Sequence, residues 1–355
     1  DVWGRSGTAA PKPSVMDFFR MEGEGIHEVA VGPVHAGIIE PGHFRFQCHG
    51  EQVLHLEISL GYQHRGIERA LMGGPHPRTI HHMETLAGDT TIGHALAYCR
   101  AVESLAGCRV PARARALRAV ALELERLANH TGDLGALAGD IGYLPTASFC
   151  GRLRGDFLNL TTLLCGSRFG RGLVRPGGVA FDADPARVAE LLQRLDATFQ
   201  DVAGAVTLLW ETPSVLARFE HTGIVSLATA IELGMVGPAA RASGRDMDSR
   251  RDFPVEGEDV TCGPVAVQES GDVFARAYVR WLEIRQSAEL IRRQLAALPA
   301  GPIAAPCGLP APNALVVSIS EGWRGEIVHV AETDAAGRFA RYKVVDPSFH
   351  NWMGL

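Results

Sequence analysis

The feature that most constrains the fold is a series of long segments in which apolar residues recur every three or four positions. These segments cover residues 78–107, 112–135, 156–164 and 271–298. This spacing places the apolar side chains on one face of an α-helix. Another helix is predicted from Pro185 to about residue 209, because Asp184 can cap it and proline suits the first helical position. The centre of the chain is therefore predicted to be a bundle of long helices.

Both ends of the central region show strand patterns instead. Residues 43–48 and 53–60 alternate polar and apolar side chains around a turn at 50–51, which predicts a hairpin within a β segment spanning 31–61. Near the C-terminus, the sequence predicts strands at 314–320, 326–333 and 338–345. We therefore predict an α+β fold with a central long-helix bundle and small β-sheets from the N-terminal and C-terminal segments.

The predicted organisation is an N-terminal extension, 1–30, followed by one domain, 31–355. Within it we expect β structure at 31–61, a helical core at 66–299 and β structure at 313–346. Residues 234–259 are rich in glycine and charge, which predicts a structured loop. Its charges alternate in sign, so we expect them to neutralise one another in a loop network; they are Arg241, Arg245, Asp246, Asp248, Arg250, Arg251 and Asp252.

Composition excludes several classes of partner. The net charge of −6 comes without a run of basic residues, so neither nucleic acid nor an anionic membrane surface is an expected partner. The seven cysteines are scattered, and no C-x-x-C occurs, which favours buried thiols in a reducing compartment over disulfides or a local metal site. The alternative is a single reactive thiol. No apolar run reaches 18 residues, so we expect no membrane span. The first residues are polar and contain Gly and Pro rather than a charged start and an apolar segment, so we expect no signal peptide.

Titratable side chains crowd residues 32–68, and the backbone is fixed at two points among them. His35 follows Gly32-Pro33, and His64-Arg65 precede Gly66. An imidazole with a near-neutral pKa can donate and recover protons during a redox step. His49 and His55 are expected to face water instead.

Asp140 is a carboxylate at the end of a long helix, within a stretch of Gly, Ala and Leu, where it either caps a neighbour or is functional. Asp89 and Thr90 precede a helix, so the alternative to a functional role is an N-cap cluster.

Together these motifs resemble the superfamily that contains the nickel-iron hydrogenase large subunits and the 49-kDa subunit of complex I. The resemblance covers nearly the whole chain in order. It is carried by Gly-Pro-Val-His at 32–35, Glu-Pro-Gly-His-Phe-Arg-Phe at 40–46, Gly-Tyr-Gln-His-Arg-Gly-Ile-Glu at 61–68, Gly-His-Ala-Leu-Ala-Tyr-Cys at 93–99, Glu-Arg-Leu-Ala-Asn-His at 125–130, Arg-Pro-Gly-Gly-Val at 175–179, Val-Gly-Pro-Ala-Ala-Arg-Ala-Ser-Gly at 236–244, Arg-Gly-Glu at 324–326 and Asp-Pro-Ser-Phe-His-Asn-Trp at 346–352.

The resemblance also implies where a metal centre would lie. Hydrogenases of this superfamily carry a C-x-x-C in the segment that matches 84–91, and Ala87 and Thr90 stand at the two cysteine positions here. Alanine has no ligating group, and threonine is a hard donor unsuited to these metals. The family's second cysteine pair would fall beyond Trp352. We therefore expect no metal bound by this chain, and the nearest resemblance is to members related to energy-converting hydrogenases that lack these cysteines.

The complex I subunit uses the corresponding cavity for a quinone, which implies a proton-donating pair of His35 and Asp140. Glu40 and His43 resemble the hydrogenase side, where the glutamate of that turn relays protons, and Glu68 is a further candidate for the relay. The side chains expected to line the cavity are Arg45, His64, Arg65, Ala87, Asp89, Thr90 and His94.

The resemblance implies a peripheral-arm subunit of a membrane-bound oxidoreductase. It would receive electrons from a 4Fe-4S cluster in a small partner subunit and pass them to a quinone or similar acceptor, coupled to ion translocation by membrane subunits. Its expected place is the cytoplasmic side of the inner membrane, held by those partners. The alternatives are a structural coupling subunit without chemistry and, third, a true nickel-iron hydrogenase. A chain with no redox cofactor motif has no electron source of its own.

Overall fold

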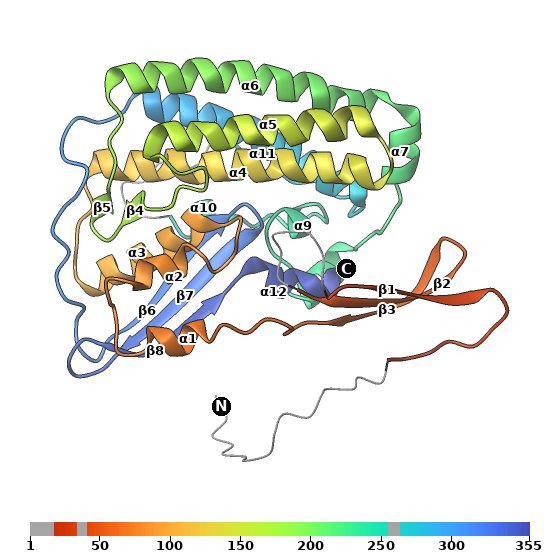
Figure 1. Cartoon of the computed structure of the whole chain (residues 1–355), viewed down its shortest axis with the longest axis horizontal. Coiled ribbons are helices and arrows are strands. Elements are labelled where there is room, and N and C mark those ends of the chain that lie inside the picture. Colours follow the sequence, from red (N-terminus) through yellow and green to blue (C-terminus); the bar gives the residue numbers. More distant parts are fainter. Residues whose placement is uncertain (1–17, 34–40, 255–262) are drawn as a thin grey trace, which may run out of the picture. The chain divides into compact units, whose positions relative to one another are not determined.

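The structure is a computed structural model that describes residues 18–33, 41–254 and 263–355. The chain divides into two compact units, Asp1–Arg65 and Gly66–Leu355. Each unit is described by itself below. Both contain a small antiparallel sheet, and the second also contains the long helices, so the predicted α+β class is confirmed (Figure 1).

The first unit contains an antiparallel sheet with the strand order β1-β2-β3. Strand β1 spans Ile26–Val31, β2 spans His43–His49 and β3 spans Gln52–Ser59. The pairing of β2 with β3 confirms the predicted hairpin. Strand β1 was not predicted, because we expected β structure only from residue 31. It lies within the predicted extension; the domain boundary at 31 stays a prediction.

Four long helices of the second unit pack along one another, as Figure 1 shows. They are α4 (Ala112–Asp140), α5 (Leu144–Cys165), α6 (Pro185–Glu211) and α11 (Val273–Ala296). Each turns an apolar face inward, and buried leucines, valines and phenylalanines such as Leu127, Phe157 and Val206 form the common core. The predicted N-cap is confirmed, because the Asp184 side chain accepts a hydrogen bond from the backbone N–H of Arg187.

The prediction of one helix over 78–107 was wrong. The segment forms a short helix, α2 (Thr79–Met83), a turn, and then α3 (Thr91–Leu105). In the turn, the backbone N–H of Thr90 donates to the carbonyl of Ala87 at 3.2 Å. The apolar periodicity continues through the turn because Leu86 also packs against the core, so periodicity alone did not reveal the break. Helix α5 likewise begins earlier than predicted, at Leu144, after a turn at Gly142 whose φ of 75° suits glycine.

Short elements connect the long helices. They are α1 (Ile67–Leu71), β4 (Val174–Arg175), β5 (Gly178–Val179), α7 (Pro213–Phe219), α8 (Leu227–Glu232), α9 (Gly237–Arg241) and α10 (Ser249–Asp252). The described part of the predicted loop 234–259 contains α9 and α10, which hold it against the rest of the unit. Gly237 has a φ of 63°, and a Cβ there would lie 2.2 Å from the carbonyl oxygen of Arg324. Only glycine permits this contact between α9 and the turn at Arg324-Gly325.

The C-terminal sheet consists of β6 (Leu315–Gly322), β7 (Gly325–Thr333) and β8 (Phe339–Val345), antiparallel in that order and followed by α12 (Pro347–Asn351) and a 3-10 turn, Trp352–Gly354. The predicted strands and the turn at 334–337 are confirmed. Helix α3 packs against β6 and β7 (Figure 1). This packing brings the first turn of α3, the β6–β7 turn and the start of α12 together, and the candidate site lies there.

Candidate functional site

The turn at Ala87–Thr90 is held by a network of polar contacts. The Thr90 hydroxyl donates to the Asp89 carboxylate at 3.1 Å. The Trp323 indole N–H lies 3.1 Å from the same hydroxyl and 3.2 Å from the Asp89 carbonyl oxygen. Asn129 of α4 donates to that carbonyl at 2.8 Å. Thr90 and Asp89 are both buried, so these contacts fix the turn.

Arg324 forms a bidentate pair with Asp89. Its two terminal nitrogens each donate to one carboxylate oxygen at 2.6 Å. The guanidinium also lies over the Trp323 ring, 3.8 Å from its centroid. Burial acts to lower the pKa of Arg324, but Asp89, with Asp133 and Asp346 at longer range, outweighs it and raises the pKa. Arg324 therefore stays charged in this pair.

The N-terminus of α3 is capped from α4. We considered Asp89 and Thr90 as an N-cap cluster, but Thr90 occupies the cap position without a side-chain cap. Glu125 takes this role instead, since its carboxyl oxygens accept from the backbone N–H groups of Ile92 at 2.6 Å and Gly93 at 3.1 Å. Burial nevertheless raises the pKa of Glu125 to about 8, against the effect of these two bonds.

His94 points to the C-terminal sheet and α12. Its Nε2 lies 2.9 Å from Oδ2 of Asp346, and its Nδ1 lies 3.1 Å from Nε2 of His329. His329 Nδ1 in turn lies 2.8 Å from the Tyr342 hydroxyl. Burial raises the pKa of Asp346, but the bonds from His94 and Ser348 outweigh it and lower the value to about 2. Burial lowers the pKa of His329 well below its ordinary value and raises that of Tyr342 well above its own.

Other predicted residues belong to the first unit or to its undescribed segment. His35 and Glu40 fall outside the described residues. His43 and Arg45 are neighbours in the first unit: His43 Nδ1 lies 3.3 Å from the Gly32 carbonyl oxygen, and Arg45 Nε lies 3.3 Å from His43 Nε2. Arg45 also pairs with Glu28. His64 and Arg65 lie on the exposed segment that ends this unit.

Asp140 and Glu68 are not part of the Asp89 cluster. Asp140 is exposed at the end of α4, eleven residues beyond Asn129, which is about 16 Å along the helix. Glu68 accepts a hydrogen bond from the backbone N–H of Val344 at 3.2 Å and pairs with Lys343 at 2.9 Å. Whether His35 meets Asp140, as the resemblance implies, remains a prediction, because His35 is not described.

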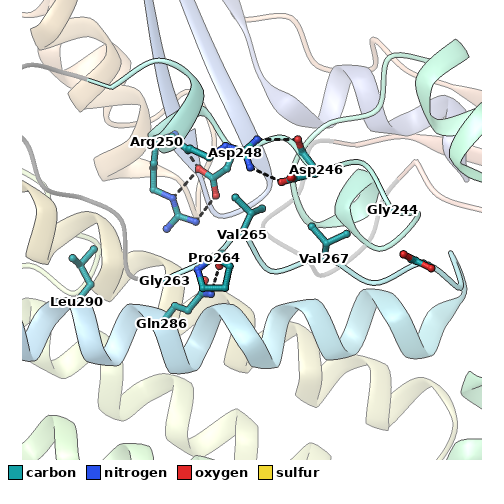
Figure 2. Close-up of a pocket in the computed structure, with 12 residues that line it drawn as sticks. Gly244, Asp246, Asp248, Arg250, Gly263, Pro264, Val265, Val267, Gln286 and Leu290 are labelled. Carbon is teal, nitrogen blue, oxygen red and sulfur yellow. Dashed lines mark hydrogen bonds and ion pairs between the residues drawn. The ribbon is translucent and has the colours of Figure 1, made fainter.

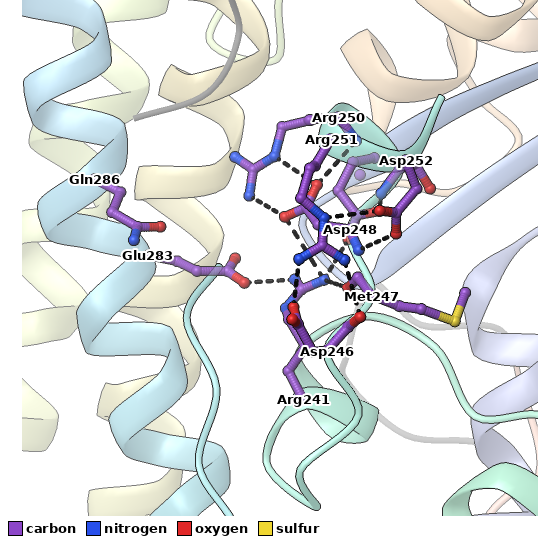
Figure 3. Close-up of polar contacts among 12 residues, drawn as sticks. Arg241, Asp246, Met247, Asp248, Arg250, Arg251, Asp252, Glu283 and Gln286 are labelled. Carbon is purple, nitrogen blue, oxygen red and sulfur yellow. Dashed lines mark hydrogen bonds and ion pairs between the residues drawn. The ribbon is translucent and has the colours of Figure 1, made fainter. Parts of the chain in front are cut away.

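Beside the site, a buried ion network joins α4, α11 and the 241–250 segment. Arg241 pairs with Glu283 at 2.5 Å and with Glu321 at 2.9 Å, and Glu283 also accepts from His130 at 2.7 Å. The predicted neutralisation within the loop is confirmed for Arg250 with Asp248 and for Arg251 with Asp246 and Asp252 (Figure 3). It is wrong for Arg241, whose main partners lie on α11 and β6. A loop sequence cannot reveal such distant partners.

One of two cavities in the second unit adjoins the Asp89 turn, and the other is lined by different residues. The smaller, about 10 Å³, adjoins the Asp89 turn and is lined by Asp89, Ile92, Glu125, Asn129, Leu158, Thr161, Arg168 and Phe169. It has room for about one water molecule. The larger, about 510 Å³, lies between the 244–251 segment, residues 263–269 and α11 (Figure 2). None of the predicted site residues lines it, and its Asp246, Asp248, Arg250 and Arg251 pair within the loop.

The described cysteines do not form a metal site. Cys48, Cys99, Cys150 and Cys165 are buried and Cys108 and Cys307 partly buried, all as free thiols. Among the residues that the structure describes, no group of three or more His, Cys, Asp or Glu side chains is arranged to hold a metal ion. In the same part of the chain, no helix is long and apolar enough to cross a membrane.

Sequence reasoning missed the residues that complete the site. Trp323, Arg324, His329 and Asp346 come from the C-terminal sheet and α12, more than 230 positions from Asp89 and His94. Arg324 lies in the Arg-Gly-Glu motif and Asp346 in the Asp-Pro-Ser-Phe-His-Asn-Trp motif. Both motifs carried the resemblance, so they could have identified these two residues as candidates for the site.

Comparisons with known proteins show relatives over nearly the whole chain. Residues 140–309 match the family described as respiratory-chain NADH dehydrogenase, 49 Kd subunit. The carbon monoxide-induced hydrogenase of Rhodospirillum rubrum is 32% identical over 330 residues, which cover 93% of this chain and 91% of that protein. NADH-quinone oxidoreductase subunit 4 of Thermus thermophilus is 30% identical over 352 residues, covering 92% and 86%. The membrane-bound hydrogenase subunit alpha of Pyrococcus furiosus is 30% identical over 348 residues, covering 91% and 80%.

The fold and these similarities define a large subunit of the oxidoreductase class that includes both complex I and hydrogenases. The chain belongs to the superfamily of the complex I 49-kDa subunit and the nickel-iron hydrogenase large subunit.

Proposed function

We propose that this chain is the redox-active large subunit of a complex-I-like or hydrogenase-related membrane complex and that it works without a nickel-iron centre. Electrons would come from an iron-sulfur cluster of a small partner subunit and pass to a quinone or a similar acceptor. Ion-pumping membrane subunits and other peripheral-arm subunits would complete the assembly. This chain would lie on the cytoplasmic side of the membrane, held by those partners.

The single observation that carries the proposal is the state of the Ala87–Thr90 turn. A nickel-iron centre of the family's kind needs thiolates at these positions, since soft sulfur ligands suit these metals. Ala87 offers no donor atom, and the Thr90 hydroxyl is already engaged by Asp89 and Trp323. The side chains of the turn therefore do not fit the metal centre, whereas the partly buried Asp89–Arg324 pair keeps charged groups beside the turn.

In this proposal, His35 and Asp140 supply a proton to the reduced acceptor, and Glu40, His43 and Glu68 relay protons. Arg45, His64, Arg65, Ala87, Asp89, Thr90 and His94 would line the acceptor cavity. An imidazole held by a carboxylate is a suitable donor, because the carboxylate stabilises the protonated ring and fixes its orientation.

The test is to purify the complex with its native partners and count nickel and iron per large subunit. We expect no nickel and only the iron of the partner clusters. Stoichiometric nickel with hydrogen evolution would overturn the proposal and favour a true hydrogenase.

Reduction of a short-chain ubiquinone analogue by reduced viologen tests the proton donor. Asp140→Asn should lower the rate about 100-fold, as expected on removing a proton donor. Glu211→Gln is the matched control, since Glu211 is also an exposed carboxylate at the last position of a long helix. Equal rates in the two variants would contradict the role of Asp140.

A structural coupling subunit is the second candidate, and the 10 Å³ cavity beside Asp89 favours it. A space for about one water cannot hold a quinone ring within the second unit alone. The two candidates differ in a simple measurement: a coupling subunit would leave quinone reduction unchanged in both Asp140→Asn and Asp89→Asn variants that still assemble.

A further inference from the structure

Two cysteines from distant parts of the chain meet where α3 ends. Cys108 follows that helix, and Cys307 lies in the connector, the segment 297–314 that joins α11 to β6. The Cys108 thiol donates to the carbonyl oxygen of Pro306 at 3.5 Å and is also a hydrogen-bond partner of the Cys307 thiol. The two sulfurs are therefore neighbours, although the four long helices lie between them in the sequence.

Backbone hydrogen bonds hold the connector on both sides of Cys307. Two residues before Cys307, the backbone N–H of Ala305 donates to a carbonyl oxygen of the β4–β5 turn at 2.9 Å. Four residues after it, the N–H of Ala311 donates to the carbonyl oxygen of Leu105, the last residue of α3, at 2.8 Å. A disulfide forms only where the two backbones already lie close together. The bond to Leu105, three residues before Cys108, keeps the connector beside the backbone that carries Cys108.

The two thiols are accessible to small reagents, and they have different chemical roles. Among the described cysteines, Cys108 and Cys307 are partly exposed, whereas the other four are buried. Burial and the neighbouring Cys108 raise the pKa of Cys307 to about 12. Because the thiolate is the nucleophile, Cys307 is a poor attacking group, and the first attack on an oxidant falls to Cys108. Cys307 is then placed to resolve the product.

We propose that Cys108 and Cys307 form a reversible disulfide that fastens the connector to the end of α3 under oxidising conditions. The oxidant is a low-molecular-weight disulfide, which exchanges with protein thiols and is itself reduced. Disulfides in a reducing compartment are usually transient and redox-sensing. A bond between these two cysteines would therefore respond to a shift of the surrounding thiol pool toward oxidation.

The exchange takes place in two steps. The Cys108 thiolate attacks one sulfur of the small disulfide, which forms a mixed disulfide and releases one small thiolate that takes up the Cys108 proton. The Cys307 sulfur then attacks the Cys108 sulfur and releases the second small thiolate, which takes up the Cys307 proton. The two cysteines have then lost two electrons and two protons, and the small disulfide has become two thiols. The first step also removes the Cys108 charge, one of the effects that raise the pKa of Cys307.

The thiol pair is separate from the Asp89 turn. Helix α3 begins at Thr91, beside that turn, and its 15 residues place the pair about 22 Å away along the helix axis. Oxidation of the pair needs neither an electron acceptor nor a partner's cluster. Its outcome is therefore independent of whether the proposed function holds.

The test uses the complex purified with its native partners. The complex is equilibrated with glutathione disulfide, its free thiols are blocked with N-ethylmaleimide, and the large subunit is digested with trypsin without reduction. Cleavage after Arg100 places Cys99 and Cys108 on separate peptides. Mass spectrometry should find the peptide 101–109 joined to the peptide 294–324, and dithiothreitol should separate them. Cys108 left unlinked, or linked to a cysteine other than Cys307, would overturn the proposal.

Three variants separate the roles of the two thiols. In Cys307→Ser, the exchange should stop at the mixed disulfide, and glutathione should stay on Cys108. In Cys108→Ser, Cys307 should stay unmodified, because burial, the largest cause of its raised pKa, remains. Cys165→Ser is the matched control, since this buried thiol donates to Thr161 within its own helix, and the bond should form as in the wild type. Equal labelling of the remaining thiol in both test variants would overturn the order of attack.

The fastening of the connector has its own readout. With the bond closed, the amide hydrogens of Ala305 and Ala311 should exchange with deuterium about tenfold more slowly, because the bond suppresses local opening of the connector. Cys307→Ser, treated in the same way, should show no such change. Equal exchange in the oxidised and reduced wild type would overturn this role of the disulfide.

Discussion

Asp89 and Arg324 are 235 positions apart in the sequence, yet two hydrogen bonds of 2.6 Å join their side chains. Arg324→Gln would leave the Asp89 carboxylate, which is 7% exposed, without its charged partner. We expect the free energy of unfolding to fall by about 3 kcal/mol, since the buried Asp89 charge loses its only charged hydrogen-bond partner among the described residues. Urea denaturation followed by tryptophan fluorescence measures this loss.

The surface pair of Arg292 and Asp196 provides the control for this prediction. Arg292→Gln should change the free energy of unfolding by less than about 1 kcal/mol, because water screens exposed ion pairs. Equal losses in the two variants would show that the Asp89–Arg324 pair contributes no more than a surface contact.

Glu125 should make stability depend on pH. Burial raises its pKa from 4.5 to about 8, so between these values the folded state binds more protons than the unfolded state. The free energy of unfolding therefore falls as pH rises through this window, by up to about 1.4 kcal/mol per pH unit from this group. Glu125→Gln cannot ionise. The free energy of unfolding of this variant, measured relative to that of the wild type, should therefore increase from pH 5 to pH 8. A constant difference across these pH values would contradict the raised pKa.

Glu283 is the shared acceptor of the buried ion network, with Arg241, Arg126 and His130 as its donors. Burial raises its pKa, but Arg241 and the other partners outweigh this effect and hold the value well below 4.5. Glu283→Gln should lower the free energy of unfolding by about 3 to 5 kcal/mol at neutral pH. The loss should become smaller as the pH falls below 4.5, because the wild type then loses the stability that its low folded-state pKa provides. Asp196→Asn serves as the exposed control.

Asp184 should contribute to stability as a helix cap. Its side chain accepts from the backbone N–H of Arg187 at 2.8 Å at the start of α6. Asp184→Ala should reduce the free energy of unfolding by about 1 kcal/mol, whereas Asp184→Asn should retain most of it. A loss of equal size in both variants would point to charge rather than capping.

Local sequence signals predicted the elements of this fold well where those signals act within a few residues. The hairpin of β2 and β3 and the start of α6 at Asp184-Pro185 follow from alternation and capping. The break between α2 and α3 did not, because Leu86 keeps the apolar period while Ala87 to Thr90 turn the chain.

The sequence by itself determined the superfamily, the long helices and the absence of cysteine from positions 87 and 90, since these depend on residue identity and spacing along the chain. Only the tertiary structure decided the partners of Asp89, His94 and Arg241. Glu125 rather than Asp89 caps α3, and Asp346 rather than a nearby residue holds His94. The physical reason is that buried charges and helix ends must be satisfied by whichever donors and acceptors packing brings close, and packing joins segments that are distant in the sequence.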